Sequence, residues 1–428
     1  NEYAGWLYGK KIMLTAPTGV GKTTFILAEL LPYCASLGKK VVILCNRRLL
    51  REQYLYDLAE QYKRYNQMEN DISIMTYQAL AEQIKQGQSM EETLKEIDLI
   101  VCDECHYFYA DSDFNAYGTF VLLQMLVACS IRKSMIFITA TAKEVTPLIE
   151  NTLRLCASWL RISDERLYLL ALYDYSNLAD YTRFDAYYVE DRETLLHQIA
   201  TSEKKTLIFI DDKSKAEGMK KRLVEKEKVK SNDIFMLNSE LLDQKGNDIV
   251  IQNLAITHRI LPKILITTSV LDNGISIHDA DVGNVVLAAD TEIAFVQMLG
   301  RIRSESGECV RLYFYPRENR YFERRLEQTQ KKLDQFKRLE NNVNQLYTTL
   351  PMQLWDDDEK FGRNAIVLAE EDNLVYSKSN LSIRIQFGGF VLAVNEFAKE
   401  KAGNEYLMYR KFLKAALSSA EEFVKIQM

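Results

Sequence analysis

The first third of the chain alternates short apolar runs with stretches in which apolar residues recur every three or four positions. The runs are rich in Val, Ile and Leu, which predicts buried strands, and the stretches between them predict amphipathic helices. Strands that alternate with helices are typical of a parallel sheet covered on both faces. We expect strands at residues 11–16, 41–45, 72–75, 97–104 and 134–141, with helices over 22–37 and from about 46 to 64.

The same alternation returns in the middle of the chain. It predicts a second set of strands at residues 206–212, 233–237, 263–269, 284–289 and 310–316. The join lies within 161–185, a stretch with several Asp and Tyr residues and no clear period. The sequence therefore predicts an α/β protein with two tandem parallel-sheet domains, residues 1–170 and 171–316, followed by a mostly helical C-terminal accessory region, residues 317–428.

A long, highly charged helix is predicted over residues 318–346, and a further helix from about Asn404. The favoured interpretation of the long helix is a solvated helix that packs an apolar stripe on the second domain. That stripe consists of Leu326, Leu333, Phe336, Leu339 and Val343. The alternative is an arm that lines a nucleic-acid track with Arg324, Arg325, Lys331, Lys332, Lys337 and Arg338.

Composition narrows the classes of protein. The 428 residues carry a net charge of -6 and are 47% hydrophobic, which is typical of a globular domain protein and argues against one coated in basic surface. A local groove of Lys and Arg would still suffice for nucleic acid. We find no apolar run of the roughly 20 residues that a membrane span needs, so no membrane partner is expected. Seven scattered cysteines predict reduced thiols and a cytoplasmic location.

The stretch "APTGVGKTT", Ala16–Thr24, follows a predicted strand and opens a predicted helix, which is the context of a phosphate-binding P-loop. Gly19 and Gly21 let the backbone curl so that N–H groups point at phosphates. Lys22 can reach the β- and γ-phosphates, and the Thr23 hydroxyl can hold Mg²⁺. We therefore predict that ATP binds with Mg²⁺ at Thr18, Gly19, Val20, Gly21, Lys22, Thr23 and Thr24.

The stretch "VCDECHYF", residues 101–108, ends another predicted strand with two acids. A P-loop enzyme needs one acid for Mg²⁺ and a second to activate water, and we assign these roles to Asp103 and Glu104. His106 would face the γ-phosphate and relay its state to the second domain. A zinc site is the alternative, because Cys102 and Cys105 form a CxxC pair. No second pair at finger spacing and no HxxxH accompany it, so Cys102 is interpreted as a core residue.

With these motifs the chain resembles the superfamily 2 helicases and translocases, specifically the DExH group, which have two RecA-like domains. The motif II sequence here is DECH. Further stretches resemble the family motifs in order. They are Cys45–Gln53 (Ia), Thr76–Leu80 (Ib), Thr139–Thr141 (III), Ile208–Glu217 (IV), Thr267–Ile277 (V) and Gln297–Arg303 (VI). The short motifs are weak individually, but motifs I, II, V and VI together are specific.

The resemblance implies roles for further residues. The nucleotide would lie between the two domains, where Gln297 and Arg301 complete the site. Arg301 and Arg303 are both candidate arginine fingers, because the commonest family spacing puts the second arginine where this chain has Ser304. Asp272 and Gly274 would approach the nucleotide from motif V. No residue could be assigned to reading the base. Trp6 or Tyr3 would either stack on it or pack against the first helix.

The resemblance also implies a nucleic-acid partner. Arg47, Thr76, Thr267 and Thr268 match positions that contact the nucleic-acid backbone in the family, a mode of binding that does not read sequence. Thr76 has an alternative role as a cap at the end of a strand. Motifs V and VI favour DNA over RNA, because Gln297 replaces the histidine typical of the DEAD-box RNA helicases. The expected function is an ATP-driven helicase. The alternatives are a duplex translocase that does not separate strands, an RNA helicase, and an ATP-gated sensor or scaffold.

Overall fold

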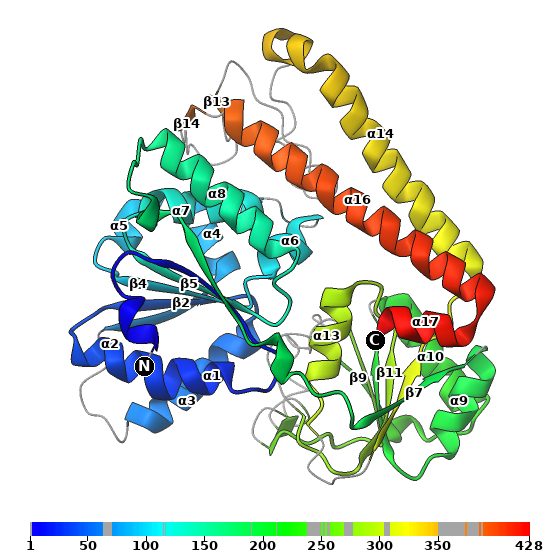
Figure 1. The fold of residues 1–428 in the computed structure, drawn as a ribbon. Coiled ribbons are helices and arrows are strands. Elements are labelled where there is room, and N and C mark those ends of the chain that lie inside the picture. The colour runs from blue at the N-terminus through cyan, green and yellow to red at the C-terminus, as the bar shows by residue number, and fades with distance from the viewer. Residues whose placement is uncertain are drawn as a thin grey trace. The chain divides into compact units, whose positions relative to one another are not determined.

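The computed structural model divides into two compact units (Figure 1). The first consists of residues 1–16, 21–177 and 327–406, and the second of residues 17–20, 178–326 and 407–428. The residues that the structure describes are 2–62, 71–113, 115, 117–189, 191–210, 212–237, 250, 253–254, 257–268, 277–303, 309–349, 373–374, 385–386 and 388–428.

The first unit is built on a six-stranded, all-parallel sheet. In spatial order its strands are β3 (Ile72–Thr76), β2 (Val41–Cys45), β4 (Leu99–Asp103), β5 (Ser134–Thr139), β1 (Lys11–Thr15) and β6 (Leu170–Asp174). β2, β4 and β5 are buried along their whole length, because helices cover both faces of the sheet (Figure 1). The predicted strands in this part of the chain are all present.

Helices join these strands. They are α1 (Lys22–Phe25), α2 (Leu31–Ser36), α3 (Arg48–Tyr62), α4 (Tyr77–Lys85), α5 (Met90–Leu94), α6 (Tyr107–Ala110), α7 (Leu122–Ser130) and α8 (Val145–Trp159). A π-helical stretch, Ile26–Leu30, lies between α1 and α2 in the segment predicted as one helix over 22–37. Pro32 near the start of α2 has no N–H to donate, which fits an altered hydrogen-bond pattern in the preceding turn.

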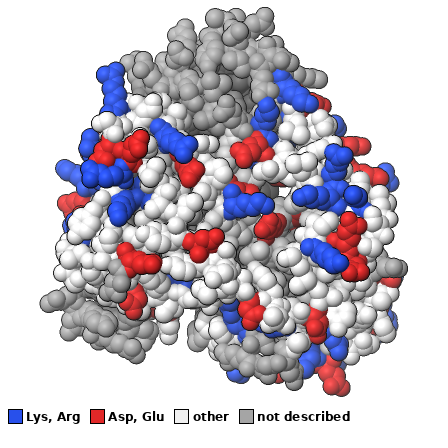
Figure 2. Space-filling view, in the orientation of Figure 1, with Lys and Arg blue, Asp and Glu red and all other residues white. Residues whose placement is uncertain are grey.

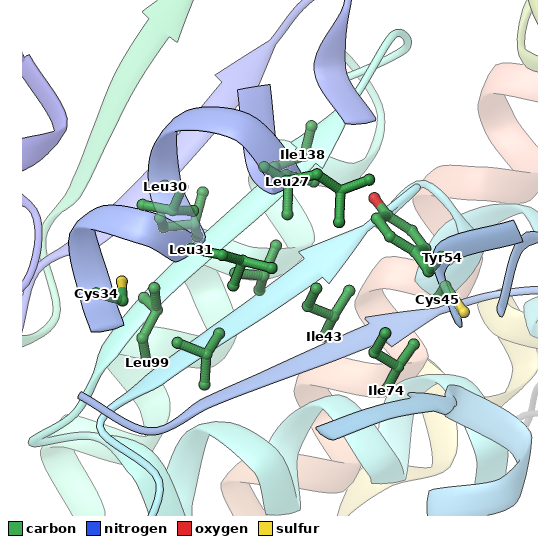
Figure 3. Packing of buried hydrophobic residues seen from close by; sticks show 14 of the residues in the cluster. Leu27, Leu30, Leu31, Cys34, Ile43, Cys45, Tyr54, Ile74, Leu99 and Ile138 are labelled. Atoms are coloured by element: carbon green, nitrogen blue, oxygen red, sulfur yellow. The ribbon is translucent and has the colours of Figure 1, made fainter. Parts of the chain in front are cut away.

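The core of the first unit lies between the helical segment α1–α2 and the sheet (Figure 3). Leu27, Leu30 and Leu31 point from the helices toward Ile43 and Leu99 on the strands. Trp6 is 3% exposed and belongs to this core, with its ring 4.9 Å from that of Tyr173. Tyr3 packs edge-on against Phe25 and Tyr33. Of the two roles considered for Trp6 and Tyr3, the structure shows packing against the first helix.

The second unit is also built on a six-stranded parallel sheet. Its order is β7 (Phe184–Tyr188), β12 (Val310–Phe314), β11 (Val282–Leu287), β8 (Lys205–Phe209), β10 (Ile264–Thr267) and β9 (Ile234–Leu237). The helices α9 (Arg192–Thr201) and α10 (Lys213–Glu225) pack Leu195, Ile199 and Leu223 into its core. α13 (Glu292–Gly300) contributes Phe295, which stacks on Phe314. The predicted fold class of two parallel-sheet α/β domains with a helical C-terminal region is confirmed.

Two strands of the large sheets were not predicted. β6 lies in the stretch 161–185 and β7 begins in it, where only the join between domains was expected. Both are edge strands in which every residue after the first is partly or fully exposed, so their sequences "LALYD" and "FDAYY" lack the continuous apolar run of a central strand. Since β6 pairs with β1, the first unit extends to Asn177, beyond the predicted boundary at residue 170.

The C-terminal region contains the predicted long helix, α14 (Asn319–Thr349). Among its described side chains, Phe322, Thr329 and Phe336 are buried at a spacing of seven residues. Phe322 packs against Phe412 and Phe423, which belong to α16 (Gly388–Ser418) and α17 (Ala420–Gln427). The buried stripe shares Phe336 with the predicted one, whereas Leu326 and Leu333 are only partly buried, and at Phe322 its partners are C-terminal helices. The side chains of Leu339, Val343 and Arg338 lie outside the described residues.

The last helices divide between the two units. In the first unit, the Lys401 ammonium of α16 donates to the main-chain oxygen of Tyr109 and to the Ser112 hydroxyl, both at 2.9 Å. In the second unit, Phe423 of α17 packs on Phe314 and Tyr188. A short hairpin, β13 (Asn373–Leu374) and β14 (Ile385–Gln386), precedes α16. Within the described ranges, no helix combines the length and apolar character needed to cross a membrane.

Candidate nucleotide and nucleic-acid sites

The predicted P-loop connects β1 to α1. Gly19 and Gly21 have φ angles of 86° and 93°, a region that favours glycine and that turns the chain sharply into the helix. Gly21 is the residue before α1, and no side chain caps the first amides of that helix. Lys22 lies in its first turn, where its ammonium donates to the Ala16 carbonyl at 3.2 Å. The loop thus combines uncapped helix amides with an ammonium group, which is the chemistry of a phosphate-binding turn.

The DECH acids lie where β4 ends. Asp103 is its last residue and Glu104 follows with a φ of 49°, and both side chains are less than 5% exposed. The Asp103 carboxylate accepts from the Glu104 N–H at 3.0 Å and from the Tyr54 hydroxyl at 2.7 Å. Burial raises the pKa of Asp103, and the charge of Glu104 raises it further. Two adjacent buried carboxyl groups of this kind are suited to metal binding and proton transfer.

His106 faces back toward the acids. Its Nδ1 lies 3.3 Å from a carboxylate oxygen of Glu104 and 3.1 Å from the Thr139 hydroxyl at the end of β5. Thr139 also accepts from the Thr141 N–H at 3.1 Å. The structure thereby brings motif II together with "TAT", the stretch that resembled motif III, inside one unit. Thr139 was noted in that motif but not among the site residues.

The oxygen groups near the P-loop fit Mg²⁺. The Tyr54 hydroxyl donates to the Asp103 carboxylate at 2.7 Å, and the Thr23 side chain lies near the same hydroxyl, so these two predicted ligands share one neighbour. Hard oxygen ligands are those that Mg²⁺ prefers, and Mg²⁺ usually takes only one or two carboxylates together with water and substrate phosphates. In the part of the chain that the structure describes, no group of three or more His, Cys, Asp or Glu side chains could hold a metal ion. One carboxylate and one hydroxyl suit a magnesium–nucleotide complex.

Two candidate nucleic-acid contacts lie in the first unit. Arg47 follows β2, and its guanidinium forms an ion pair with Asp111 at 3.0 Å, with 29% and 26% of the two side chains exposed. Thr76 ends β3 and is 6% exposed, and its hydroxyl accepts from the Ala79 N–H at 3.1 Å. Thr76 therefore caps α4, the alternative role that the sequence left open. A contact of either residue with nucleic acid stays a prediction.

The motif V residues lie in and after β10. Thr267 is fully buried, and its hydroxyl donates to the main-chain oxygen of Thr268 at 3.1 Å. Thr268 follows the strand and is partly exposed. Asp272 and Gly274 lie outside the described residues. Of the motif V predictions, Thr268 thus has the more accessible hydroxyl for a backbone contact.

The motif VI residues gather at the end of α13. Arg301 donates to the Gln297 side-chain oxygen at 3.1 Å, and these side chains are 7% and 1% exposed. Burial lowers the pKa of Arg303 to about 10, with further contributions from the charges of Arg183 and Arg301. A group with that pKa is still charged at neutral pH. Neighbouring guanidinium groups are suited to binding an anion, and the assignment of Arg301 or Arg303 as an arginine finger stays a prediction.

Some site contacts could not be read from the motifs. Tyr54 was not predicted as a site residue, although it directly follows the motif Ia stretch on α3. Its spacing from Leu50 and Leu58 marks one buried helix face, and that periodicity alone indicates a core residue. Lys401 likewise came from a region in which no motif was recognised.

Comparison with family models finds two matches. Residues 8–144 match the model described as "Type III restriction enzyme, res subunit", and residues 190–304 match "Helicase conserved C-terminal domain". The first match contains the P-loop and the DECH acids. The second contains the motif V and motif VI residues.

Individual relatives agree with these matches. The chain is 26% identical over 181 residues to the mouse protein "ATP-dependent RNA helicase DHX58", a segment that covers 36% of this chain and 26% of that protein. A solved structure of Dbp5 from S. cerevisiae, bound to RNA and ADP BeF3, is similar with a TM-score of 0.51 and 16% identity. It covers 73% of this chain and 81% of the Dbp5 chain. A variant of the same protein gives a TM-score of 0.50 and 17% identity.

Proposed function

Since the two matched domains indicate a superfamily 2 helicase, we propose that this protein hydrolyses ATP with Mg²⁺ in order to move along nucleic acid. The observation that carries the proposal is that Lys22, Thr23 and the DECH acids belong to the same unit. β1, β5 and β4 are adjacent parallel strands, so the groups that follow them lie at one edge of the sheet. The charge of Lys22 favours the ionised form of Asp103 and so lowers its pKa, which supports a shared site.

Glu104 is the proposed general base. Its carboxylate takes a proton from a water molecule as that water attacks the γ-phosphorus, and the bond to the β–γ bridging oxygen breaks to give ADP and phosphate. His106 would help to hold Glu104 in place, because its Nδ1 contacts both the Glu104 carboxylate and the Thr139 hydroxyl. Thr23 and Asp103 would hold Mg²⁺, which when bound neutralises phosphate charge.

The proposed track is nucleic acid bound through its backbone. Lysines and arginines are interspersed with aspartates and glutamates over the visible face of both units (Figure 2). Such a surface matches the net charge of -6 and favours a few local phosphate contacts over broad electrostatic binding. DNA is the proposed track on the grounds of motifs V and VI. RNA is the alternative, and the names of both relatives above mention RNA.

Steady-state ATP hydrolysis with different polymers tests the proposal. We expect little activity without nucleic acid and strong stimulation by single-stranded DNA, with weaker effects of duplex DNA, single-stranded RNA and duplex RNA. Stimulation by duplex alone would instead support a translocase that leaves strands paired, and stimulation by RNA alone would identify an RNA helicase. If ATP binds and no polymer stimulates hydrolysis, the motor function is wrong and an ATP-gated sensor or scaffold replaces it.

Arg47→Ala is expected to weaken nucleic-acid binding about equally for all sequences. Loss of one phosphate contact lowers the slope of log affinity against log salt by about 1. The ion pair with Asp111 is partly exposed to solvent and contributes little to stability, about 0–1 kcal/mol, so the fold should persist. Fluorescence anisotropy of a labelled oligonucleotide over a salt series measures the slope. Arg154→Ala, an exposed arginine of α8 outside every motif, is the control. If the slope of log affinity against log salt is the same for Arg47→Ala as for the control variant, Arg47 does not belong to the binding surface.

A further inference from the structure

Tyr54 is a fully buried tyrosine whose polar end lies at the candidate magnesium site. It comes from α3, and 0% of its surface is exposed. Figure 3 shows its ring in the apolar cluster with Cys45 and Ile43. The hydroxyl is the donor in its contact with Asp103, because an ionised carboxylate can only accept. A core ring alone would not need a hydroxyl in this place.

The Tyr54 hydroxyl joins two segments that the chain keeps far apart. It donates to a carboxylate oxygen of Asp103 at 2.7 Å, and the Thr23 side chain is a neighbour of the same hydroxyl. Thr23 stands on the first turn of α1, and Asp103 stands at the end of β4. One side chain of α3 thus holds the motif II carboxylate at a point close to the P-loop hydroxyl.

The other Asp103 oxygen is held independently. It accepts from the Glu104 N–H at 3.0 Å, so the main chain restrains one oxygen and Tyr54 restrains the other. A carboxylate held at both oxygens cannot rotate freely about its terminal bond. Hydrogen-bond partners that fix a metal-binding carboxylate in this way typically contribute a factor of about 10–100 to metal affinity or activity.

We propose that Tyr54 is a positioning residue for the magnesium–nucleotide site, because its hydroxyl orients the Asp103 carboxylate. This inference rests on the proposed function, since it takes Thr23 and Asp103 as the groups that hold Mg²⁺. Tyr54 itself makes no contact with substrate in this role. Its ring anchors the hydroxyl in the core, which keeps the donor in one place.

Tyr54→Phe tests the role, because it removes the hydroxyl and leaves the ring. With ADP present, Mn²⁺ used as a paramagnetic probe should bind about tenfold more weakly to the variant, as measured by the EPR signal of free Mn²⁺. ADP affinity measured in EDTA should change less than about twofold, because neither Thr23 nor Asp103 needs to be aligned without metal. The Mg²⁺ concentration that half-saturates ATP hydrolysis should rise in parallel.

Tyr77→Phe is the matched control. Tyr77 is also 0% exposed, and its hydroxyl donates to Asp103, but to the main-chain oxygen at 2.9 Å. Both variants lose one buried hydrogen bond to the same residue, so both should lower the unfolding midpoint, while only Tyr54→Phe should weaken Mn²⁺ binding. Equal Mn²⁺ affinities for the two variants would overturn the role of Tyr54. If the unsubstituted protein binds no Mn²⁺ with ADP, the magnesium assignment in the proposed function fails first, and this inference fails with it.

Discussion

Replacing Glu104 by glutamine is expected to slow ATP hydrolysis by about 10²–10⁴-fold while nucleotide binding is retained, since a positioned general base contributes rate in that range. An amide has nearly the size of the carboxylate, but it cannot take a proton from water. The side chain is 4% exposed and has His106 within 3.3 Å, so little space is available for a substitute base such as a shifted water chain. Single-turnover hydrolysis and binding of a fluorescent ADP analogue measure the two quantities separately.

The Glu104→Gln variant should also be at least as stable as the unsubstituted protein. Asp103 and Glu104 are buried side by side, and the charge of Glu104 helps to raise the pKa of Asp103. Removing that charge relieves repulsion, so we expect a higher unfolding midpoint at neutral pH. Glu91→Gln, at an exposed position on α5, is the control for a carboxylate outside the site. Hydrolysis within about threefold of that control would rule out Glu104 as the base, given the 10²–10⁴ range above.

Replacing Lys22 by alanine should weaken ATP binding by about 10–100-fold, because a hydrogen bond to a charged group contributes about 1.5–3 kcal/mol. Hydrolysis should fall further, since the ammonium also stabilises the charge that develops on the γ-phosphoryl group. Lys22 lies in the first turn of α1, and alanine has the highest helix propensity, so the turn itself should persist. Equilibrium binding of ATP and of ADP, compared with kcat, measures both effects.

The control for Lys22→Ala is Lys95→Ala, an exposed lysine in the same unit. Circular dichroism of both variants should show the same helix content as that of the unsubstituted protein. If ATP binding is weakened equally at Lys22 and Lys95, the effect reflects net charge rather than a P-loop contact. An ATP affinity unchanged at Lys22 would show that the loop from Ala16 to Thr24 does not hold the phosphates.

Much of the architecture was determined by sequence pattern. Continuous apolar runs such as Val41–Cys45 and Leu99–Asp103 predicted central strands, because a strand covered on both faces needs apolar residues at every position. The P-loop could be recognised for a local reason. Two glycines with positive φ before a lysine and a helix define a backbone shape within a few residues. The acids at the end of β4 could be recognised because they lie at the end of a predicted strand.

The tertiary structure decided the features in which distant residues meet. The edge strands β6 and β7 have mixed sequences, since exposure on one side relaxes the demand for apolar residues, and only pairing with β1 and β12 identifies them. Thr76 matched a nucleic-acid position in sequence, yet its hydroxyl caps α4. The spacing of Tyr54 along α3 indicated only that it is a core residue. Its contacts with Thr23 and Asp103 depend on how α3 packs against β4 and α1, and helix packing of that kind is set by the whole unit rather than by local sequence.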